Sequence, residues 1–204
     1  MSSNTSSVSK FLLDPWSPAK VAVPSIIVQA IIHRTVLEKL PIRTLTLWLS
    51  LTNTYWFATT LSHSFLDTPI KQYAPNVDKE QSTNIGRHIF SWLNKLEASY
   101  SFHGRGHVAV GVVSLDLFCV WRQKIIDRGG FVDKALVAAT LVPSAIVILQ
   151  SAYLLPTLNE RADKLIKGQS LEPSSVHKQY IGFEAVKVVG LAVAGIRFGK
   201  LLTH

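Results

Sequence analysis

The chain has 204 residues, of which 48% are hydrophobic and only 17% are charged. Ordinary soluble domains carry about 25% charged residues, so this balance favours one membrane-embedded unit over a soluble enzyme. The formal net charge of +8 is spread between apolar segments without a nucleic-acid-binding signature, which indicates lipid and not nucleic acid as the partner, and the single cysteine, Cys119, excludes an internal disulfide and a Cys-rich metal site.

Residues 1–42 are predicted to form an amino-terminal arm. The Ser-rich start lacks the apolar core of a secretory signal, and no cleavage is expected. Residues 21–32 give a dozen apolar-rich positions, too few to span a bilayer, and Ser25, Gln29 and His33 share one helical stripe. We expect an interfacial or partner-covered helix ended by Pro41. A fifth spanning helix with a snorkelling charged end is the alternative.

Residues 43–204 are predicted to contain four spanning helices, at about 45–65, 103–121, 134–156 and 179–200. The third is the clearest, because no charged side chain lies between Lys134 and Asn159, and that length crosses a hydrocarbon layer of about 30 Å. Pro143 predicts a kink in it. A buried core helix of a soluble protein is the alternative. The expected fold class is therefore all-α, a multi-pass membrane helical bundle with amphipathic interfacial helices.

The segments between the spans are predicted to lie at the membrane surface. Residues 82–98 place apolar side chains at helical spacing opposite Arg87, Asn94 and Lys95, which indicates an amphipathic helix in the interface plane. Before it, Pro69 and Pro75 are expected to prevent a long helix. In the last span, Gly182, Gly190 and Ala194 offer smooth patches for close helix approach. The candidate lipid-headgroup contacts are Arg87, Lys95, Arg122, Lys124 and Arg128.

Several polar side chains fall inside the predicted spans, where they normally face other helices. The candidate intramembrane polar residues are Asn53, His63, Asp116, Gln150, Glu184 and Lys187. Glu184 and Lys187 stand three residues apart and can pair. Asp116 must be protonated, paired with a cation of another helix, or close to water, and Arg122 favours the last option. With Glu184 and Lys187 it could form a charge relay, although a structural ion pair is the commoner explanation.

The order of these parts resembles the transmembrane protein 205 family. The similarity rests on the segments NIGRHIFSWLNKLEASYSF, YLLPTLNERADKLIKG and SSVHKQYIGFEAVKVV, and it is clearest from residue 150 to 188. It covers roughly the last two thirds of the chain, whereas residues 1–40 depart from the pattern. The resemblance implies a four-helix membrane fold and, for most members, no established chemistry.

No cofactor or metal is expected from the histidines. His103 and His107 stand four residues apart, the spacing at which two imidazoles can share a metal or haem, but Gly104 and Gly106 weaken the helix and no third ligand is nearby. No catalytic arrangement can be argued from spacing, so we expect no enzyme.

Three functions follow as hypotheses. The first is a non-catalytic accessory or assembly subunit of a larger membrane complex, such as a mitochondrial respiratory or ATP synthase assembly. Its expected partners are other membrane subunits and lipids, anionic ones such as cardiolipin included. The mitochondrial inner membrane is the first expectation for its location, with endomembranes or the plasma membrane as alternatives. The second is a small transporter or resistance protein using Asp116, Glu184 and Lys187. The third is a haem- or metal-binding membrane protein using His63, His103 or His107.

Overall fold

The computed structural model describes residues 7–14, 17–98, 100–102, 106–108, 110–169 and 174–203. The first half contains α1 (Ser7–Leu13), α2 (Ser17–Thr35), the 3₁₀ turn η1 (Leu37–Lys39), α3 (Ile42–Leu61), the π-helical segment η2 (Ser62–Asp67), α4 (Thr68–Tyr73) and α5 (Lys79–Ala98). The second half contains β1 (Tyr100–Phe102), β2 (Gly106–Val108), α6 (Val110–Asp127), α7 (Lys134–Leu149), the π-helical segment η3 (Gln150–Leu154), α8 (Leu155–Ile166) and α9 (Val176–Lys200). The all-α class is confirmed, with one small antiparallel hairpin that pairs Ser101 with His107.

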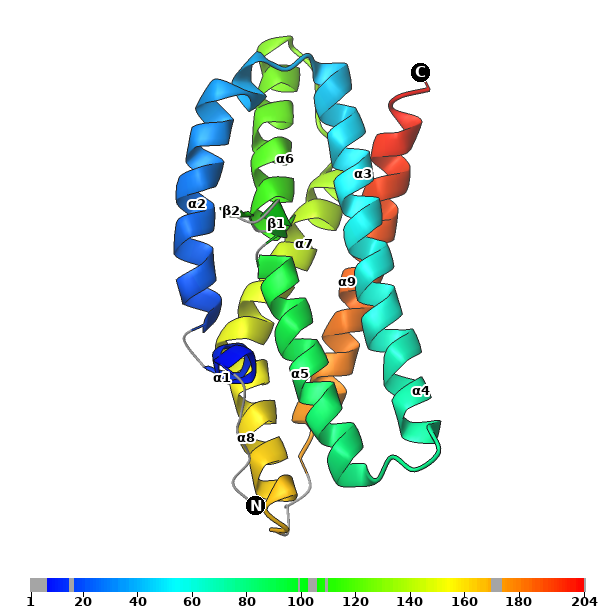
Figure 1. Ribbon diagram of the computed structural model, residues 1–204. Helices are drawn as coiled ribbons and strands as arrows, with labels where there is room; N and C mark the ends of the chain where they lie inside the picture. The colour runs from blue at the N-terminus through cyan, green and yellow to red at the C-terminus, as the bar shows by residue number, and fades with distance from the viewer. Residues whose placement is uncertain are drawn as a thin grey trace.

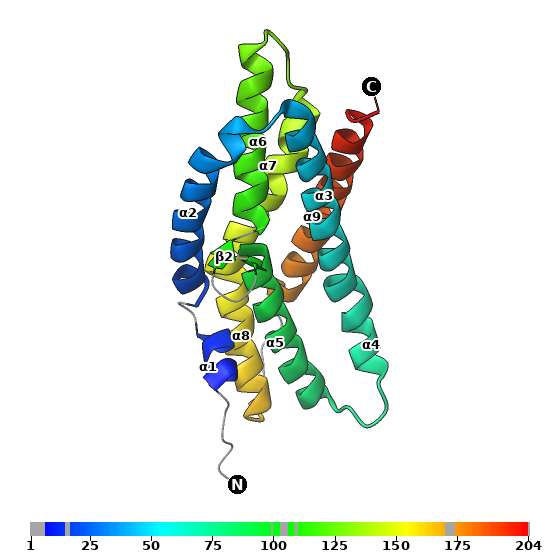
Figure 2. The same cartoon turned by 45° about the horizontal axis from the view of Figure 1, so that its top comes forward.

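Four long rods form the bundle (Figure 1). One is α3 continued by α4, the second is α5 followed end to end by α6, the third is α7 continued by α8, and the fourth is α9. The α9 rod packs chiefly on α3 and α7. In both ribbon views α2 lies outside the bundle along α6, and α1 lies beside α5 (Figure 2). The expected amphipathic helix is therefore part of the bundle.

Two helices are longer than the sequence predicts. The first runs without interruption from Ile42 to Tyr73 through η2, so the expectation that Pro69 prevents a long helix is wrong. A π-helical segment precedes Pro69 and leaves the proline near the start of the next α-helical segment, where its missing N–H costs little. The same device, η3 before Pro156, lets α7 continue into α8.

The second predicted span is displaced. Residues 100–102 and 106–108 form the hairpin, and α6 begins only at Val110 and then continues through Arg122 and Lys124 to Asp127. Glycine destabilises a helix interior, which accounts for the hairpin at Gly106. Gln123 Nε2 donates to Asp127 at 2.7 Å within the polar end of α6, and Lys124 Nζ donates to the Glu38 carbonyl at 2.6 Å, which ties this end to η1.

By length and composition, one helix of the described chain, Lys134–Ile166, could cross a membrane. The prediction of four spanning helices therefore lacks this support. Thr and Asn side chains dilute the apolar content of α3, and charged side chains interrupt α6 and α9.

An apolar core joins α3, α6, α7 and α9 near the carboxyl end of α9. Trp121 packs edge-on against Phe198 with ring centroids 5.3 Å apart and donates from Nε1 to Thr46 at 2.9 Å. A Cβ on Gly190 would lie 3.0 Å from Pro143, and Ala194 is fully buried, so both allow close approach as expected. Gly182 has open space around its Cβ position and has no such role.

Candidate functional site

Four buried polar side chains meet at mid-height in the bundle. Glu97 comes from α5, Gln150 from η3, and Glu184 and Lys187 from α9. Their exposed fractions are 2%, 0%, 1% and 0%. We call these four residues the polar centre. Since it unites three of the four rods, and α3 lines it from the fourth, it fixes how the rods stand against one another.

Lys187 is the hub of the polar centre. Its Nζ lies 2.7 Å from the Glu97 carboxylate and 2.7 Å from Glu184 Oε1, and it donates to Gln150 Oε1 at 3.1 Å. An ammonium group has three donors, and these contacts use all of them. Complete hydrogen bonding is the condition under which a buried charge is tolerated.

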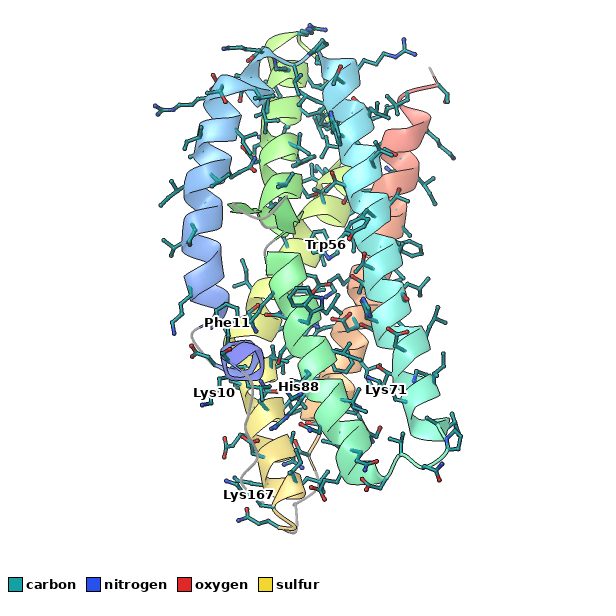
Figure 3. The ribbon with its side chains drawn as sticks, viewed as in Figure 1. Lys10, Phe11, Trp56, Lys71, His88 and Lys167 are labelled. Atoms are coloured by element: carbon teal, nitrogen blue, oxygen red, sulfur yellow. The ribbon has the colours of Figure 1, made fainter. Side chains whose placement is uncertain are left out.

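Side chains of α3 and η2 complete the hydrogen bonding of both carboxylates. Trp56 Nε1 and Thr60 Oγ1 donate to Glu97 Oε1 at 3.1 and 2.9 Å, and Ser64 Oγ donates to Glu184 Oε2 at 2.7 Å. Figure 3 shows Trp56 at mid-height of the bundle. Gln150 Nε2 donates to Glu184 Oε1 at 2.7 Å. Each carboxylate therefore has donors from at least two helical segments.

The charges of the polar centre do not balance, because two carboxylates face one ammonium. Desolvation by burial raises the pKa of Glu97, Lys187 opposes that rise, and the neighbouring Glu184 adds to it. One further positive charge, a proton or a cation, would neutralise the site.

Two cavities lie against this part of the bundle. The first, of about 240 Å³, is beside Glu184 and is lined by Ser64, Phe65, Thr68, Pro69, Phe90, His177, Tyr180, Ile181 and Glu184. We call it the Glu184 cavity. The second, of about 210 Å³, contains Ser91, Lys95 and Ser151 among its lining residues. Burial lowers the pKa of Lys95 to about 8, an effect that Asp14 partly opposes.

The structure brings three of the six intramembrane candidates together. Glu184 and Lys187 form the predicted ion pair, and Gln150 joins them. Asn53 is buried elsewhere and donates to the carbonyl of Leu49, one turn earlier, at 2.7 Å. His63 lies 2.6 Å from Asp67 on its own helix.

Asp116 lies apart from the polar centre. Its carboxylate accepts from Gln29 Nε2 and lies 2.6 Å from His33 Nδ1, so it contacts the polar stripe of α2 that the sequence predicts. His33 Nε2 is also 3.2 Å from Glu38. The charge relay proposed for Asp116 with Glu184 and Lys187 is not formed among the described contacts. Asp116 is therefore held by hydrogen bonds to α2.

Glu97 is the residue that sequence reasoning missed. It lies within residues 82–98, whose amphipathic pattern predicts a helix at the membrane surface, but its side chain points into the bundle. The sequence does contain a pattern that indicates the hydrogen-bond donors on the α3 rod that face the polar centre. Trp56, Thr60 and Ser64 recur every four residues and thus form one stripe on the α3 rod.

The lipid-headgroup candidates fall into two groups. Arg122 and Arg128 are exposed at the α6–α7 end, where Lys124 also lies. Arg87 is paired with Asp163 of α8, and Lys95 is only 5% exposed and donates to the Ser91 carbonyl at 3.2 Å. Arg87 therefore links α5 to α8, whereas this hydrogen bond of Lys95 stays within α5.

The histidines give no metal site within the described part of the chain, where no three His, Cys, Asp or Glu side chains are grouped to hold an ion. His103 and the side chain of His107 lie outside the described residues. In comparisons with family models, with curated proteins and with solved structures, nothing matches the chain.

Proposed function

We propose that the chain is a multi-pass membrane protein whose helices α3, α6, α7 and α9 pass through the bilayer. The observation that carries this proposal is the distribution of polarity. Large apolar side chains are outside, with Ile148 67% and Val189 63% exposed, whereas Lys187 and Glu184 are at most 1% exposed inside. A soluble bundle would expose such charges and bury such isoleucines, whereas lipid as the solvent reverses the preference.

The exposed apolar surface is long enough to cross a bilayer. It includes Val23, Ile27 and Ile31 of α2, all 59% exposed, and Tyr153 on the α7–α8 rod, also 59% exposed. From Lys134 to Tyr153 a helix rises about 30 Å, the thickness of the hydrocarbon layer. The amphipathic helices α5 and α8 lie mainly beyond this zone (Figure 1). The resemblance to the transmembrane protein 205 family agrees with four passes.

One end of the bundle is strongly basic. There the end of α2, the start of α3, the α6–α7 turn and the end of α9 lie together (Figure 1). They carry Arg34, Lys39, Arg43, Arg122, Lys124, Arg128, Lys134, Arg197 and Lys200, against the carboxylates of Glu38, Asp127 and Asp133. By the positive-inside rule this basic end faces the more negative compartment, where anionic lipids such as cardiolipin are its expected contacts.

Within the membrane we propose a non-catalytic accessory role in a larger complex, with the mitochondrial inner membrane as its location. Support comes from α2, which packs only one side against the bundle and leaves Val23, Ile26, Ile27 and Ile31 outside as a second apolar helix face. On a native gel of mildly solubilised membranes, the protein should migrate with a defined set of subunits. A monodisperse monomer in the same detergent would count against this role.

The membrane proposal is tested by alkaline extraction and by labelling. The protein should stay in the pellet after carbonate treatment. With Cys119 replaced by Ser, Arg128→Cys and Lys164→Cys should react with an impermeant maleimide from opposite sides of sealed vesicles, and Ile148→Cys should not react from either side. Release into the supernatant, or labelling of both end positions from the same side, would refute the proposal.

A transporter is the second candidate, and the Glu184 cavity is the observation that favours it. The cavity reaches a buried charge network that touches all four rods. The pathway would use Glu184 and Lys187 and not Asp116, which contacts α2. Glu184→Gln should then abolish flux in reconstituted vesicles, while Asp116→Asn retains it.

A further inference from the structure

We propose that the Glu184 cavity is a binding site for a small organic ammonium ion, with Glu184 as its counter-charge and Phe90 and Tyr180 as its aromatic wall. The inference goes beyond the membrane proposal, since it rests on the cavity and the polar centre alone. The bound ammonium ion would supply the further positive charge that neutralises the polar centre.

The cavity has the shape and position for such a guest. Its 240 Å³ lie between η2 and α4 on one side, α5 on another and the first turns of α9 on the third. Ser64 lines it and donates to Glu184 Oε2 at 2.7 Å, so the cavity reaches the carboxylate directly. Tyr180, 2% exposed, lines it one turn before Glu184 on α9 and is hydrogen-bonded to it.

The electrostatics favour a cation. Lys187 is shared between Glu97 and Glu184, which leaves one negative charge in excess when both acids are ionised. Lys71 lies near the cavity but does not line it, and burial lowers the pKa of its ammonium, an effect that Asp67 partly opposes. His177 is the only titratable lining residue besides Tyr180 and Glu184 among those described. An incoming cation therefore meets a polar centre in which two carboxylates share one ammonium.

The aromatic wall selects an organic ammonium over a metal ion. Phe90 and Tyr180 meet edge to face with centroids 5.2 Å apart, and Phe65 lines the same cavity. Phe90 already attracts a cation, because Lys71 Nζ lies 5.6 Å from its ring centroid without a hydrogen-bond partner. Rings and one carboxylate suit an ammonium ion carrying carbon, whereas Na⁺ and other hard cations prefer a full set of oxygen ligands.

The test is thermal unfolding of the full chain in detergent, titrated with methylammonium chloride against NaCl at equal ionic strength. We expect a saturable rise of the midpoint with methylammonium alone, because a ligand that binds only the folded state stabilises it. Phe90→Leu should weaken apparent affinity about tenfold, the loss expected for a desolvated cation–π contact. Glu184→Gln should abolish the rise. Glu160→Gln, an exposed carboxylate paired with Lys164 on α8, is the matched control and should leave it unchanged.

Four results would overturn the inference. The first is that methylammonium gives no saturable rise of the unfolding midpoint in the unaltered protein, and the second is that NaCl raises the midpoint equally. The third is a midpoint that depends on pH alone, which would indicate that a proton and not an ammonium ion is bound. The fourth is a Phe90→Leu variant that binds methylammonium as tightly as the unaltered protein. The last remains decisive if Glu184→Gln does not fold. Because the titration uses solubilised protein, its outcome is separate from that of carbonate extraction.

Discussion

Lys187 and Glu97 are 90 residues apart in the chain, yet the ammonium of Lys187 lies 2.7 Å from the Glu97 carboxylate in the bundle interior. This contact joins α9 to α5, which also meet where Phe90 packs against Tyr180. Within three residues of Lys187, Glu184 provides the second carboxylate. The ion pairs thus fix the position of α5, which has only one apolar face, against the rest of the bundle.

Removing the ammonium should therefore destabilise the protein strongly. Lys187→Met leaves two buried carboxylates without their cation, and we expect a loss of about 3–5 kcal/mol in the free energy of unfolding. Unfolding in mixed detergent micelles measures it. Lys200→Met, exposed at the end of the same helix, should change little. Adding Glu97→Gln to Lys187→Met should recover part of the loss, and purely additive effects would show that the pair is not coupled.

The indole donor to Glu97 can be tested separately. Trp56→Phe keeps an aromatic ring in the buried place and removes the Nε1 hydrogen bond of 3.1 Å, so it should cost about 1–3 kcal/mol, the range for leaving a buried acceptor short of a donor. Trp48→Phe, on the same helix but 51% exposed, should be neutral within about 0.5 kcal/mol. Equal effects in the two variants would remove the role assigned to Trp56.

The small residues of α9 give a third test. A Cβ on Gly195 would lie 2.8 Å from Thr54 Oγ1 and 3.5 Å from the Thr54 backbone nitrogen, so Gly195→Ala should force α3 and α9 apart and cost about 1–3 kcal/mol. Gly182→Ala meets nothing within 4 Å and should stabilise α9 by up to about 1 kcal/mol through helix propensity. Unfolding midpoints of the two variants should move in opposite directions, and a shift in the same direction would contradict the packing.

Sequence periodicity predicted the helices themselves, but it did not predict which faces are buried in the bundle or where the helices end. The pair of Glu184 and Lys187 follows from spacing within one helix, and the stripe of Gln29 and His33 follows from the same rule. Glu97 could not be placed, because its partners come from α9 and α3 and only tertiary packing selects the face of α5 that turns inward.

The predicted ends of two helices were wrong for a local reason. Pro69 and Pro156 are normally read as helix breakers, but a π-helical segment before each lets the rod continue. Such a segment depends on how the rod packs and has no signature in a hydropathy pattern. The hairpin of residues 100–102 and 106–108 shows the reverse, because Gly106, which disfavours a helix, marks in the sequence the place where the second predicted span does not form.

The pH dependence of stability should reveal Lys95. Burial lowers its pKa to about 8 from the ordinary 10.5, so between these values the unfolded chain binds more protons than the folded protein. Stability should therefore rise from pH 8 to 10.5 and be insensitive to this group below pH 8, where both states are protonated. The lowered pKa of Lys71, caused by burial, acts in the same direction. Lys95→Met should flatten the slope of unfolding free energy against pH, whereas Lys164→Met, on exposed α8, should retain it. A slope unchanged by Lys95→Met would show that this ammonium is solvated in the folded protein.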